Sequence, residues 1–519
     1  MTVTRPEQNF WRALARRKLS QGVVALLIVA GCAQRSLKPP TLAEAAANLS
    51  PHEQLRRDLR EIFSDRTVDH GLWSIVVQSL KQGETLYSLN SFRMQTPASN
   101  QKVFTAAAAA ERLGWDYRYT TRIYATGPID ANGAVNGDLI VVSDGDPTIN
   151  PRHPERWGIF DEWARQLAAK GVRQVNGYLI GDDNAFEEPG WAPGWAWDDL
   201  ALGYGAAVSA LQYNENQVEL LIGPGLDVAA RGIISVSPSG SGLTINHQVS
   251  TVAAGQPSRV TLQRTPGSGL LTVTGQVAVG AAPLTEHAAV DNPTLVYLNA
   301  LRAALHRQGV NIERTPLDID DVRMRPDMSN ATMLIEDQSP PLSELIDVTL
   351  KWSRNIYAET MLRTMAVQPM EKSTAGGLAA LEETMNNWGV FREYFLARDG
   401  SGLSRYDYLS ADALTWVLTH LWRDPRHADA FRATLPVFGV NGNVANRLKD
   451  TPASGRVWAK TGSMSQVRSL SGYIATAEGE PLVFAFIVNG FRVPAREIDS
   501  AMDRALLRLV EFKHAGHTP

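Results

Sequence analysis

Cysteine is almost absent from this 519-residue chain: Cys32 is the only one, so the chain can form no internal disulfide. The ten histidines include neither an H-E-x-x-H motif nor a pairing with cysteine of the kind that binds zinc. The G-x-S-x-G, P-loop and G-x-G-x-x-G motifs are missing as well. These absences disfavour a zinc peptidase, and we expect a reaction that uses neither a metal nor a cofactor.

The chain also lacks an excess of positive charge. Lysine and arginine number 50 against 54 aspartates and glutamates, which gives a net charge of −4. Nucleic-acid binding proteins present a basic patch, so we expect no nucleic-acid partner. The hydrophobic content of 44% is ordinary for a globular chain, and the length predicts two or three domains.

Long hydrophobic runs are scarce too, and the clearest one lies near the N-terminus. Residues 22–31 are apolar and follow Arg16, Arg17 and Lys18. Ten residues are too few to span a bilayer core of about 30 Å, so residues 1–31 are predicted to be a secretory signal peptide. The sequence Val29-Ala30-Gly31-Cys32 resembles a bacterial lipobox, which predicts lipidation of Cys32.

Lipidation implies a protein of the bacterial periplasm or cell envelope, attached to a membrane at its N-terminus. Residues 32–50 would then be a tether. The alternative is a signal peptide without lipidation, with an incidental Cys32. A free thiol is a liability in an oxidising compartment, which favours lipidation.

Three short motifs follow one another in a fixed order. They are Ser99-Asn100-Gln101-Lys102 (S-x-x-K), Ser353-Arg354-Asn355 (S-x-N) and Lys460-Thr461-Gly462 (K-T-G). S-x-x-K and K-T-G each occur once, and a second S-x-N at Ser88-Leu89-Asn90 lies upstream of S-x-x-K. Each motif alone arises easily by chance, but the ordered set is the signature of penicillin-recognising serine acyl enzymes.

The first motif lies at the start of a predicted helix that contains an alanine run and stops at Gly114. Ser99 and Lys102 are three positions apart, so their side chains share one face of the first turn. The positive end of the helix dipole favours a serine alkoxide and disfavours a protonated lysine. This pattern predicts a serine nucleophile beside an amine base.

The third motif lies on a predicted strand in the C-terminal part of the chain. A helix is predicted over residues 496–512, after the last strand. Alternating and apolar runs predict five strands in all, which we expect to form one antiparallel sheet. The expected strands span residues 74–80, 84–89, 456–460, 469–476 and 482–488.

Taken together, these motifs resemble those of the D-alanyl-D-alanine carboxypeptidase/endopeptidase family, the low-molecular-mass class C penicillin-binding proteins. The resemblance covers roughly residues 65–510. One position departs from it: Gly442-Asn443-Val444 stands where the family commonly has Gly-Thr-Leu. The matching segments are residues 97–102, 137–139, 145–148, 193–195, 197–200, 204–206, 214–216, 399–405 and 460–463.

The resemblance implies an α+β fold: a β-lactamase/transpeptidase-like domain, with a five-stranded antiparallel sheet flanked by helices. From position 99 to position 353 the first two motifs are 254 positions apart. A compact domain needs less, so we expect a large, mostly β accessory insertion at residues 121–290, in which the resemblance allows a nested subdomain. Residues 51–120 and 291–513 would form the discontinuous catalytic domain, to which a helix at residues 293–309 returns the chain.

The resemblance also implies a role for each motif residue. Ser99 is the nucleophile and Lys102 its base. Ser353 relays a proton to the leaving amine, and Lys460 polarises the Ser353 hydroxyl. Asn355 holds the substrate amide. The substrate carboxylate is bound by Thr461, Gly462 and Ser463, and the backbone N–H groups of Ser99 and Ser463 form the oxyanion hole. The implied protein is a serine-type D,D-peptidase, a carboxypeptidase or endopeptidase of peptidoglycan stem peptides, which β-lactams acylate.

Two further residues are candidates for contact with the stem peptide. Arg405 follows the loop that begins at Asp399, and Asp399 is expected to fix that loop through an Asx turn. Asp182 would reach from the insertion towards a cationic side chain of the peptide. The alternatives are a structural role for Arg405 and a solvated turn for Asp182.

Three other functions stay open from the motifs alone. A β-lactamase-like hydrolase has the same motifs, but the long spacing argues against it. A cross-linking transpeptidase differs only in its acyl acceptor. A catalytically inactive cell-wall scaffold is disfavoured because all three motifs are intact.

Overall fold

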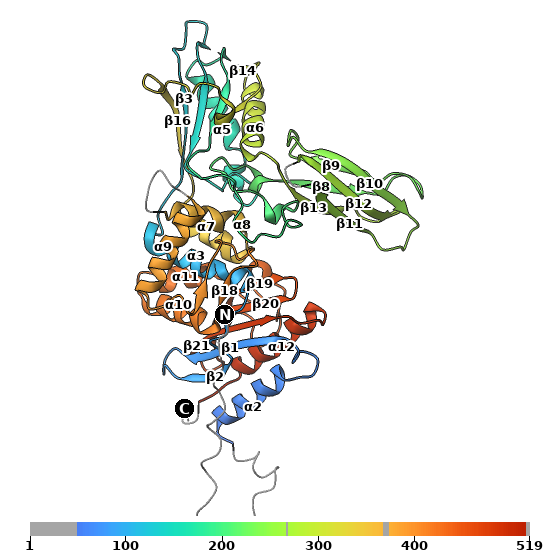
Figure 1. Ribbon diagram of the computed structural model, residues 1–519, viewed down its shortest axis with the longest axis vertical. Helices are drawn as coiled ribbons and strands as arrows, with labels where there is room; N and C mark the ends of the chain where they lie inside the picture. Colours follow the sequence, from blue (N-terminus) through green and yellow to red (C-terminus); the bar gives the residue numbers. More distant parts are fainter. Residues whose placement is uncertain (1–48, 266–267, 367–372, 515–519) are drawn as a thin grey trace, which may run out of the picture. The chain divides into compact units, whose positions relative to one another are not determined.

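The computed structural model describes residues 49–265, 268–366 and 373–514 (Figure 1). Within these ranges no helix is both long and apolar enough to cross a bilayer. The predicted signal peptide, the predicted lipidation site Cys32 and almost all of the predicted tether lie outside the described residues.

The catalytic domain is built on the predicted five-stranded antiparallel sheet, in the order β19-β20-β21-β1-β2. The N-terminal and C-terminal parts of the chain meet in this sheet because β21 pairs with β1, with Trp73 opposite Val488. The five strands that the sequence predicted are present, and they form one antiparallel sheet as expected. The strands are β1 (Leu72–Ser79), β2 (Thr85–Leu89), β19 (Val457–Met464), β20 (Val467–Ala475) and β21 (Pro481–Asn489).

Both faces of this sheet are covered by helices, because successive side chains of a strand point to opposite faces. Phe484 and Phe486 of β21 pack with α2 (Pro51–Phe63) and α12 (Ala495–Val510). Val483 and Ile487 pack on the other face with α3 (Gln101–Leu113) and α10 (Ala411–Arg423). That second layer also contains α7 (Leu342–Lys351), α8 (Asn355–Thr364), α9 (Thr374–Asn387) and α11 (Ala428–Thr434).

The insertion has a sheet of its own, in the order β15-β7-β5-β3-β16. Helices α5 (Ile159–Ala169) and α6 (Pro293–Arg307) pack against each other beside it. The strands are β3 (Thr120–Ala125), β5 (Leu139–Ser143), β7 (Leu179–Asp182), β15 (Leu317–Asp318) and β16 (Thr332–Gln338).

The position of α6 differs from the expectation that the helix at residues 293–309 returns the chain to the catalytic domain. Its apolar residues Leu298, Leu301 and Leu305 are buried in the core of the insertion. The chain returns only after β16, which pairs with β3, so the insertion extends to about Gln338 rather than residue 290. Apolar spacing predicts a helix correctly but does not say which surface that helix covers.

Six strands within the insertion form two three-stranded sheets, β13-β8-β9 and β10-β12-β11. They share a separate apolar core, in which Val218 and Leu220 meet Leu271 and Val273. This unit is nested in the insertion. Its strands are β8 (Gln217–Gly223), β9 (Ile233–Ser237), β10 (Thr244–Val252), β11 (Arg259–Arg264), β12 (Leu270–Ala278) and β13 (Leu284–Ala289).

Candidate active site

Ser99 lies in a single 3-10 turn, Ala98–Asn100, which leads directly into α3. The turn begins with Ala98 in the left-handed region at φ 47°. Side chains of β20 hold the turn in place: Asn100 Nδ2 donates to Ser469 Oγ at 2.6 Å and Ser471 Oγ donates to Asn100 Oδ1 at 2.5 Å. The predicted helix and its stop at Gly114 are confirmed.

Lys102 connects the first two motifs. Its Nζ lies 2.9 Å from Ser99 Oγ and 2.6 Å from Asn355 Oδ1, and it donates to the carbonyl of Ser401 at 2.7 Å. The side chain is completely buried. The contact between Ser99 and Lys102 that the spacing predicted is therefore present.

Burial decides the protonation of Lys102. Removal from water penalises the ammonium form and lowers the pKa of Lys102 to about 7, although the charges of Asp399 and Glu359 act to raise it. A lysine with a pKa near neutrality is uncharged in a large fraction of molecules. It can accept the proton of a hydroxyl at hydrogen-bond distance.

The second and third motifs meet through Lys460. Its Nζ donates to Ser353 Oγ at 2.8 Å and to the carbonyl of Thr461 at 2.7 Å. Lys460 is completely buried, and burial together with the charge of Lys102 holds its pKa well below the usual value. Ser353 has a left-handed φ of 58° just before α8, which begins with Asn355.

Strand β19 approaches the turn of Ser99 closely because Gly462 has no side chain. A Cβ at Gly462 would lie 3.0 Å from the backbone N of Ser99 and 2.8 Å from the carbonyl O of Pro97. The next residue, Ser463, is exposed. The backbone of β19 thus runs beside the nucleophile, where the resemblance places the oxyanion hole.

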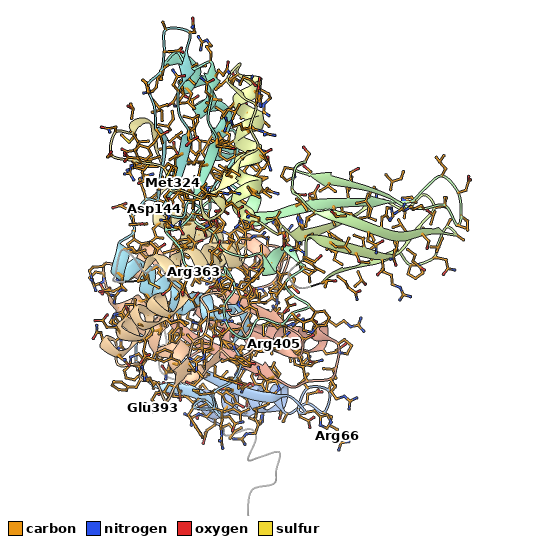
Figure 2. All side chains as sticks on the ribbon, turned by 45° about the horizontal axis from the view of Figure 1, so that its top comes forward. Arg66, Asp144, Met324, Arg363, Glu393 and Arg405 are labelled. Carbon is orange, nitrogen blue, oxygen red and sulfur yellow. The ribbon has the colours of Figure 1, made fainter. Side chains whose placement is uncertain are left out.

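Residues of the first two motifs and Ser463, which directly follows the third, border one cavity of about 280 Å³. Lys102 and Lys460 lie beneath it, hydrogen-bonded to residues of its wall. Arg405, labelled in Figure 2, borders the same cavity. The lining residues are Ser99, Asp199, Tyr204, Ser353, Asn355, Gly402, Leu403, Arg405, Ser463, Met464 and Ser465.

Besides the two lysines, the sequence-predicted residues Asp182, Thr461 and Gly462 lie outside this lining. Asp182 ends β7 in the insertion, and its Oδ1 accepts the backbone N–H of Asn184 at 3.2 Å. Its contact with the stem peptide stays a prediction. Thr461 is partly buried and accepts a hydrogen bond at 2.9 Å from Nδ2 of Asn443, the residue at which the chain departs from the family pattern.

A group of buried carboxylates around Lys102 was not predicted from the sequence. Glu359 Oε1 accepts the backbone N–H groups of Gly400 and Ser401, at 3.0 and 2.8 Å. Burial and the charge of Asp399 raise the pKa of Glu359. Glu359 follows Asn355 by one helical turn, a spacing that places both residues on one face of α8 but does not indicate burial.

Asp399 organises the loop that carries the carbonyl of Ser401. Its carboxylate accepts the backbone N–H groups of Gly402 at 2.6 Å and Ser404 at 2.7 Å. Asp399 therefore fixes this loop, through residues three and five positions on rather than through the bond to the second residue that defines an Asx turn. Asp407 is buried behind it, and burial together with the charge of Asp399 raises the pKa of Asp407 well above the usual value.

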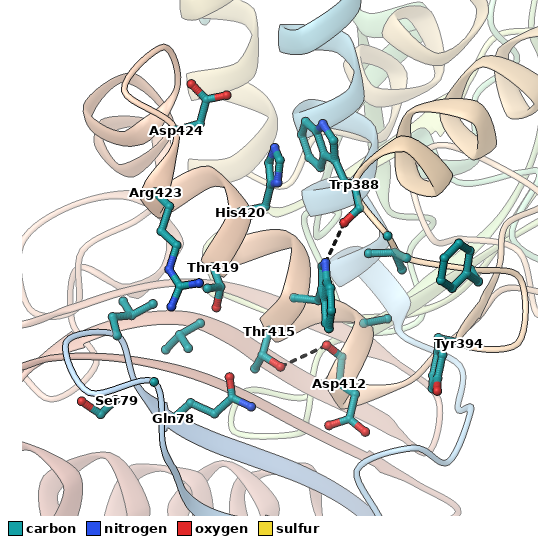
Figure 3. A pocket seen from close by; sticks show the side chains of 18 of the residues that line it. Gln78, Ser79, Trp388, Tyr394, Asp412, Thr415, Thr419, His420, Arg423 and Asp424 are labelled. Carbon is teal, nitrogen blue, oxygen red and sulfur yellow. Dashed lines mark hydrogen bonds between the residues drawn. The ribbon is translucent and has the colours of Figure 1, made fainter.

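A larger cavity of about 1120 Å³ lies elsewhere, along α10 (Figure 3). Its lining includes Trp388, Phe391, Tyr394 and Trp416, and Trp416 Nε1 donates to the carbonyl of Trp388 at 2.7 Å. None of its lining residues belongs to the three motifs. Size alone therefore does not identify the reactive cavity in this fold.

Comparison with known proteins finds the same family that the motifs resemble. The sequence pattern of the D-Ala-D-Ala carboxypeptidase 3 (S13) family matches residues 55–509. The D-alanyl-D-alanine carboxypeptidase of Actinomadura sp. is 32% identical, over 99% of this chain and 93% of that relative. The D-alanyl-D-alanine carboxypeptidase DacB of Haemophilus influenzae is 25% identical, over 84% of this chain and 88% of that relative.

Solved structures show the same fold. Penicillin binding protein 4 (dacB) from Haemophilus influenzae aligns with a TM-score of 0.75 at 24% identity, over 87% of this chain and 98% of that chain. Its complex with a novel β-lactam aligns with a TM-score of 0.71 at 23% identity, over 90% of this chain and 100% of that chain. These matches confirm the predicted β-lactamase/transpeptidase-like fold.

The family pattern covers residues 55–509, which include all three motifs and the insertion. Ser99, Ser353 and Asn355 border one cavity, and Lys460 of the third motif is hydrogen-bonded to Ser353. This chain therefore belongs to the D-Ala-D-Ala carboxypeptidase 3 (S13) family of serine peptidases.

Proposed function

We propose that Ser99 attacks a D-alanyl-D-alanine peptide bond of peptidoglycan and forms a serine ester, with neutral Lys102 as the general base. The observation that carries this proposal is the distance of 2.9 Å between Lys102 Nζ and Ser99 Oγ, combined with the lowered pKa of Lys102. When Oγ bonds to the carbonyl carbon, its proton passes to Nζ. The oxyanion that forms accepts hydrogen bonds from the backbone N–H groups of Ser99 and Ser463.

The C–N bond then breaks, and the leaving amine needs a proton. Ser353 borders the cavity, and its Oγ accepts a hydrogen bond from Lys460 Nζ at 2.8 Å. Its hydroxyl is suited to relay to the amine the proton that Lys102 took from Ser99, which leaves Lys102 neutral again. Asn355 borders the cavity and holds the substrate amide, while Thr461, Gly462 and Ser463 bind the terminal carboxylate. Water hydrolyses the ester and regenerates Ser99. A β-lactam acylates Ser99 by the same attack.

The reaction is tested with a peptide that ends in D-alanyl-D-alanine. We expect the wild type to release D-alanine, and Ser99→Ala to lose about 10⁴-fold or more of the rate while remaining folded. Ser465→Ala is a matched control at the rim of the same cavity and should keep most of the activity. Equal release by wild type and Ser99→Ala would rule out the serine ester.

Carboxypeptidase and endopeptidase activity differ in the leaving amine, which is free D-alanine or the side chain of a neighbouring stem peptide. The cavity is partly open, and Arg405 and Asp199 on its wall are suited to bind a peptide beyond the scissile bond. We propose that the chain performs both reactions. Digestion of cross-linked muropeptides tests this, because only an endopeptidase converts dimers into monomers.

We also propose that the protein is a lipoprotein of the bacterial periplasm or cell envelope. The support is the lipobox-like sequence that ends at Cys32. Labelling of cells with a fatty-acid probe should mark the wild type and not Cys32→Ser. Label that persists in Cys32→Ser would contradict the lipid anchor.

A further inference from the structure

A cluster of two histidines and a glutamate lies outside the catalytic cavity, where three distant segments meet. His52 lies in the first turn of α2, Glu84 directly precedes β2, and His514 follows α12 near the end of the described chain. Helix α2 and strand β2 lie side by side at the lower end of the ribbon in Figure 1. The three side chains are partly buried.

The distances within this cluster match the coordination of one small divalent cation. His52 Nε2 lies 2.9 Å from His514 Nδ1 and 3.5 Å from Glu84 Oε1, and His514 Nδ1 lies 3.7 Å from Glu84 Oε1. Tetrahedral zinc has ligand bonds of about 2.0–2.2 Å, which places its ligand atoms about 3.3 Å apart. The three observed separations lie on either side of that value.

A second carboxylate holds His514 in the orientation that a metal requires. His514 Nε2 lies 2.8 Å from Glu480 Oε1, which also accepts the hydroxyl of Ser79 at 2.6 Å. A histidine ligand commonly donates its other N–H to a carboxylate in this way, which fixes the tautomer and makes the ligand more basic. With the proton on Nε2, the Nδ1 lone pair of His514 points to His52 and Glu84.

A simple hydrogen bond from His52 to His514 explains only part of the arrangement. It would leave Glu84 Oε1 beyond good hydrogen-bond distance of both rings, at 3.5 and 3.7 Å. A cation at the centre satisfies all three ligand atoms, and the carboxylates of Glu84 and Glu480 balance its charge.

A second cluster in the described part of the chain shows the contrast. Glu111, Asp424 and His427 also lie within reach of one another, but Arg426 occupies the place of a cation there. Its guanidinium lies 3.0 Å from Glu111 and 2.7 Å from Asp424. In contrast, no lysine or arginine of the described residues forms an ion pair with Glu84 or Glu480.

We propose that His52 Nε2, His514 Nδ1 and Glu84 Oε1 bind one Zn²⁺, with water at the fourth position. Imidazole and carboxylate donors in a tetrahedral arrangement favour zinc over magnesium or calcium. The metal ties α2 and the segment after α12 to the β1–β2 hairpin. The site shares no residue with the cavity of Ser99, and the proposal does not depend on the proposed function.

Metal analysis of the full-length chain tests the site directly. The protein is incubated with excess Zn²⁺, dialysed against metal-free buffer and measured by mass spectrometry of the metal. We expect about one zinc per chain in the wild type, and less than about one fifth of that in His52→Gln and in Glu84→Gln. His70→Gln is the matched control, because its side chain is 87% exposed, and it should retain the zinc.

Two further readouts separate metal binding from damage to the fold. Zn²⁺ should raise the Tm of the wild type and of His70→Gln by several degrees, but not that of His52→Gln or Glu84→Gln. Circular dichroism should show that all four proteins are folded, and cleavage of the D-alanyl-D-alanine peptide should stay within about twofold of the wild type. Absence of bound zinc in the wild type, or equal zinc in the wild type and the two ligand variants, would overturn the proposal.

Discussion

The protonation of Lys102 results from two opposing effects on one buried amine. Removal from water favours the neutral amine, whereas Asp399 and Glu359 favour the ammonium. Burial has the larger effect, and the pKa falls to about 7. A base with a pKa near the working pH combines availability with proton affinity.

The rate of acylation by a β-lactam should therefore depend on pH. Only neutral Lys102 accepts the proton of Ser99, so the second-order rate constant should rise about tenfold per unit below pH 7 and level off above it. Stopped-flow or quench measurement with a chromogenic β-lactam gives this profile. A rate that is flat from about pH 5 to 9 would contradict the role of Lys102 as base.

Glu359→Gln should move that profile in a defined direction. The glutamine preserves the shape of the side chain, and Oε1 still accepts the N–H groups of Gly400 and Ser401. Loss of the negative charge removes one influence that raises the pKa of Lys102, so the midpoint should move to lower pH. Glu344→Gln, an exposed residue of α7, is the control and should leave the midpoint in place. A midpoint that moves to higher pH in Glu359→Gln would contradict the prediction.

At the scale of elements, the reactive geometry depends on how closely β19 approaches the turn before α3. Gly462 permits that approach, since any Cβ would also lie 2.2 Å from Ser469 Oγ. Ser469 itself belongs to the hydrogen bonds that hold the turn of Ser99. The strand and the turn therefore cannot separate without moving the nucleophile.

Gly462→Ala should push β19 away from Ser99. We expect acylation by penicillin to fall about 100-fold, because reacting groups tolerate little displacement, and the free energy of unfolding to fall by about 1–3 kcal/mol. Gly158→Ala is the control, because a Cβ there meets nothing within 4 Å. Acylation and denaturant unfolding measure the two effects. An alanine variant that acylates at the wild-type rate would show that the close approach is not required.

Local sequence patterns predicted the helices and strands correctly, but they did not always predict which layer each element packs against. The apolar run at residues 482–488 and the stop at Gly114 are determined by neighbouring residues, so β21 and α3 were predictable. The same kind of pattern predicted α6 but assigned it to the wrong layer, because its partner α5 lies more than a hundred residues upstream. Among the buried carboxylates, the spacing predicted neither the burial of Glu359 nor its hydrogen bonds.

At the scale of the whole molecule, the insertion contacts the S-x-N motif directly. Glu215 of the insertion is buried and pairs with Arg354, which lies between Ser353 and Asn355. The distance from Arg354 Nε to Glu215 Oε2 is 2.5 Å, and Arg152 pairs with the other carboxylate oxygen at 2.9 Å. The accessory insertion therefore helps to position the catalytic cavity.

Glu215→Ala should leave both arginines without their buried partner. We expect a loss of about 2 kcal/mol in the free energy of unfolding and about a tenfold lower acylation rate, because the turn of Ser353 is no longer held. Glu219→Ala removes an exposed carboxylate of β8 and serves as the control. The acylation rate at a fixed pH, together with denaturant unfolding, measures both effects. An unchanged acylation rate in folded Glu215→Ala would separate the insertion from the reaction.

The most direct test of the central claim is the position of the covalent adduct. The full-length chain is incubated with a labelled penicillin, digested, and mapped by mass spectrometry of the peptides. We predict one labelled peptide, with the adduct on Ser99, and no label in Ser99→Ala. Folded wild-type protein without an adduct, or with the adduct on another residue, would contradict the assignment of Ser99 as the nucleophile.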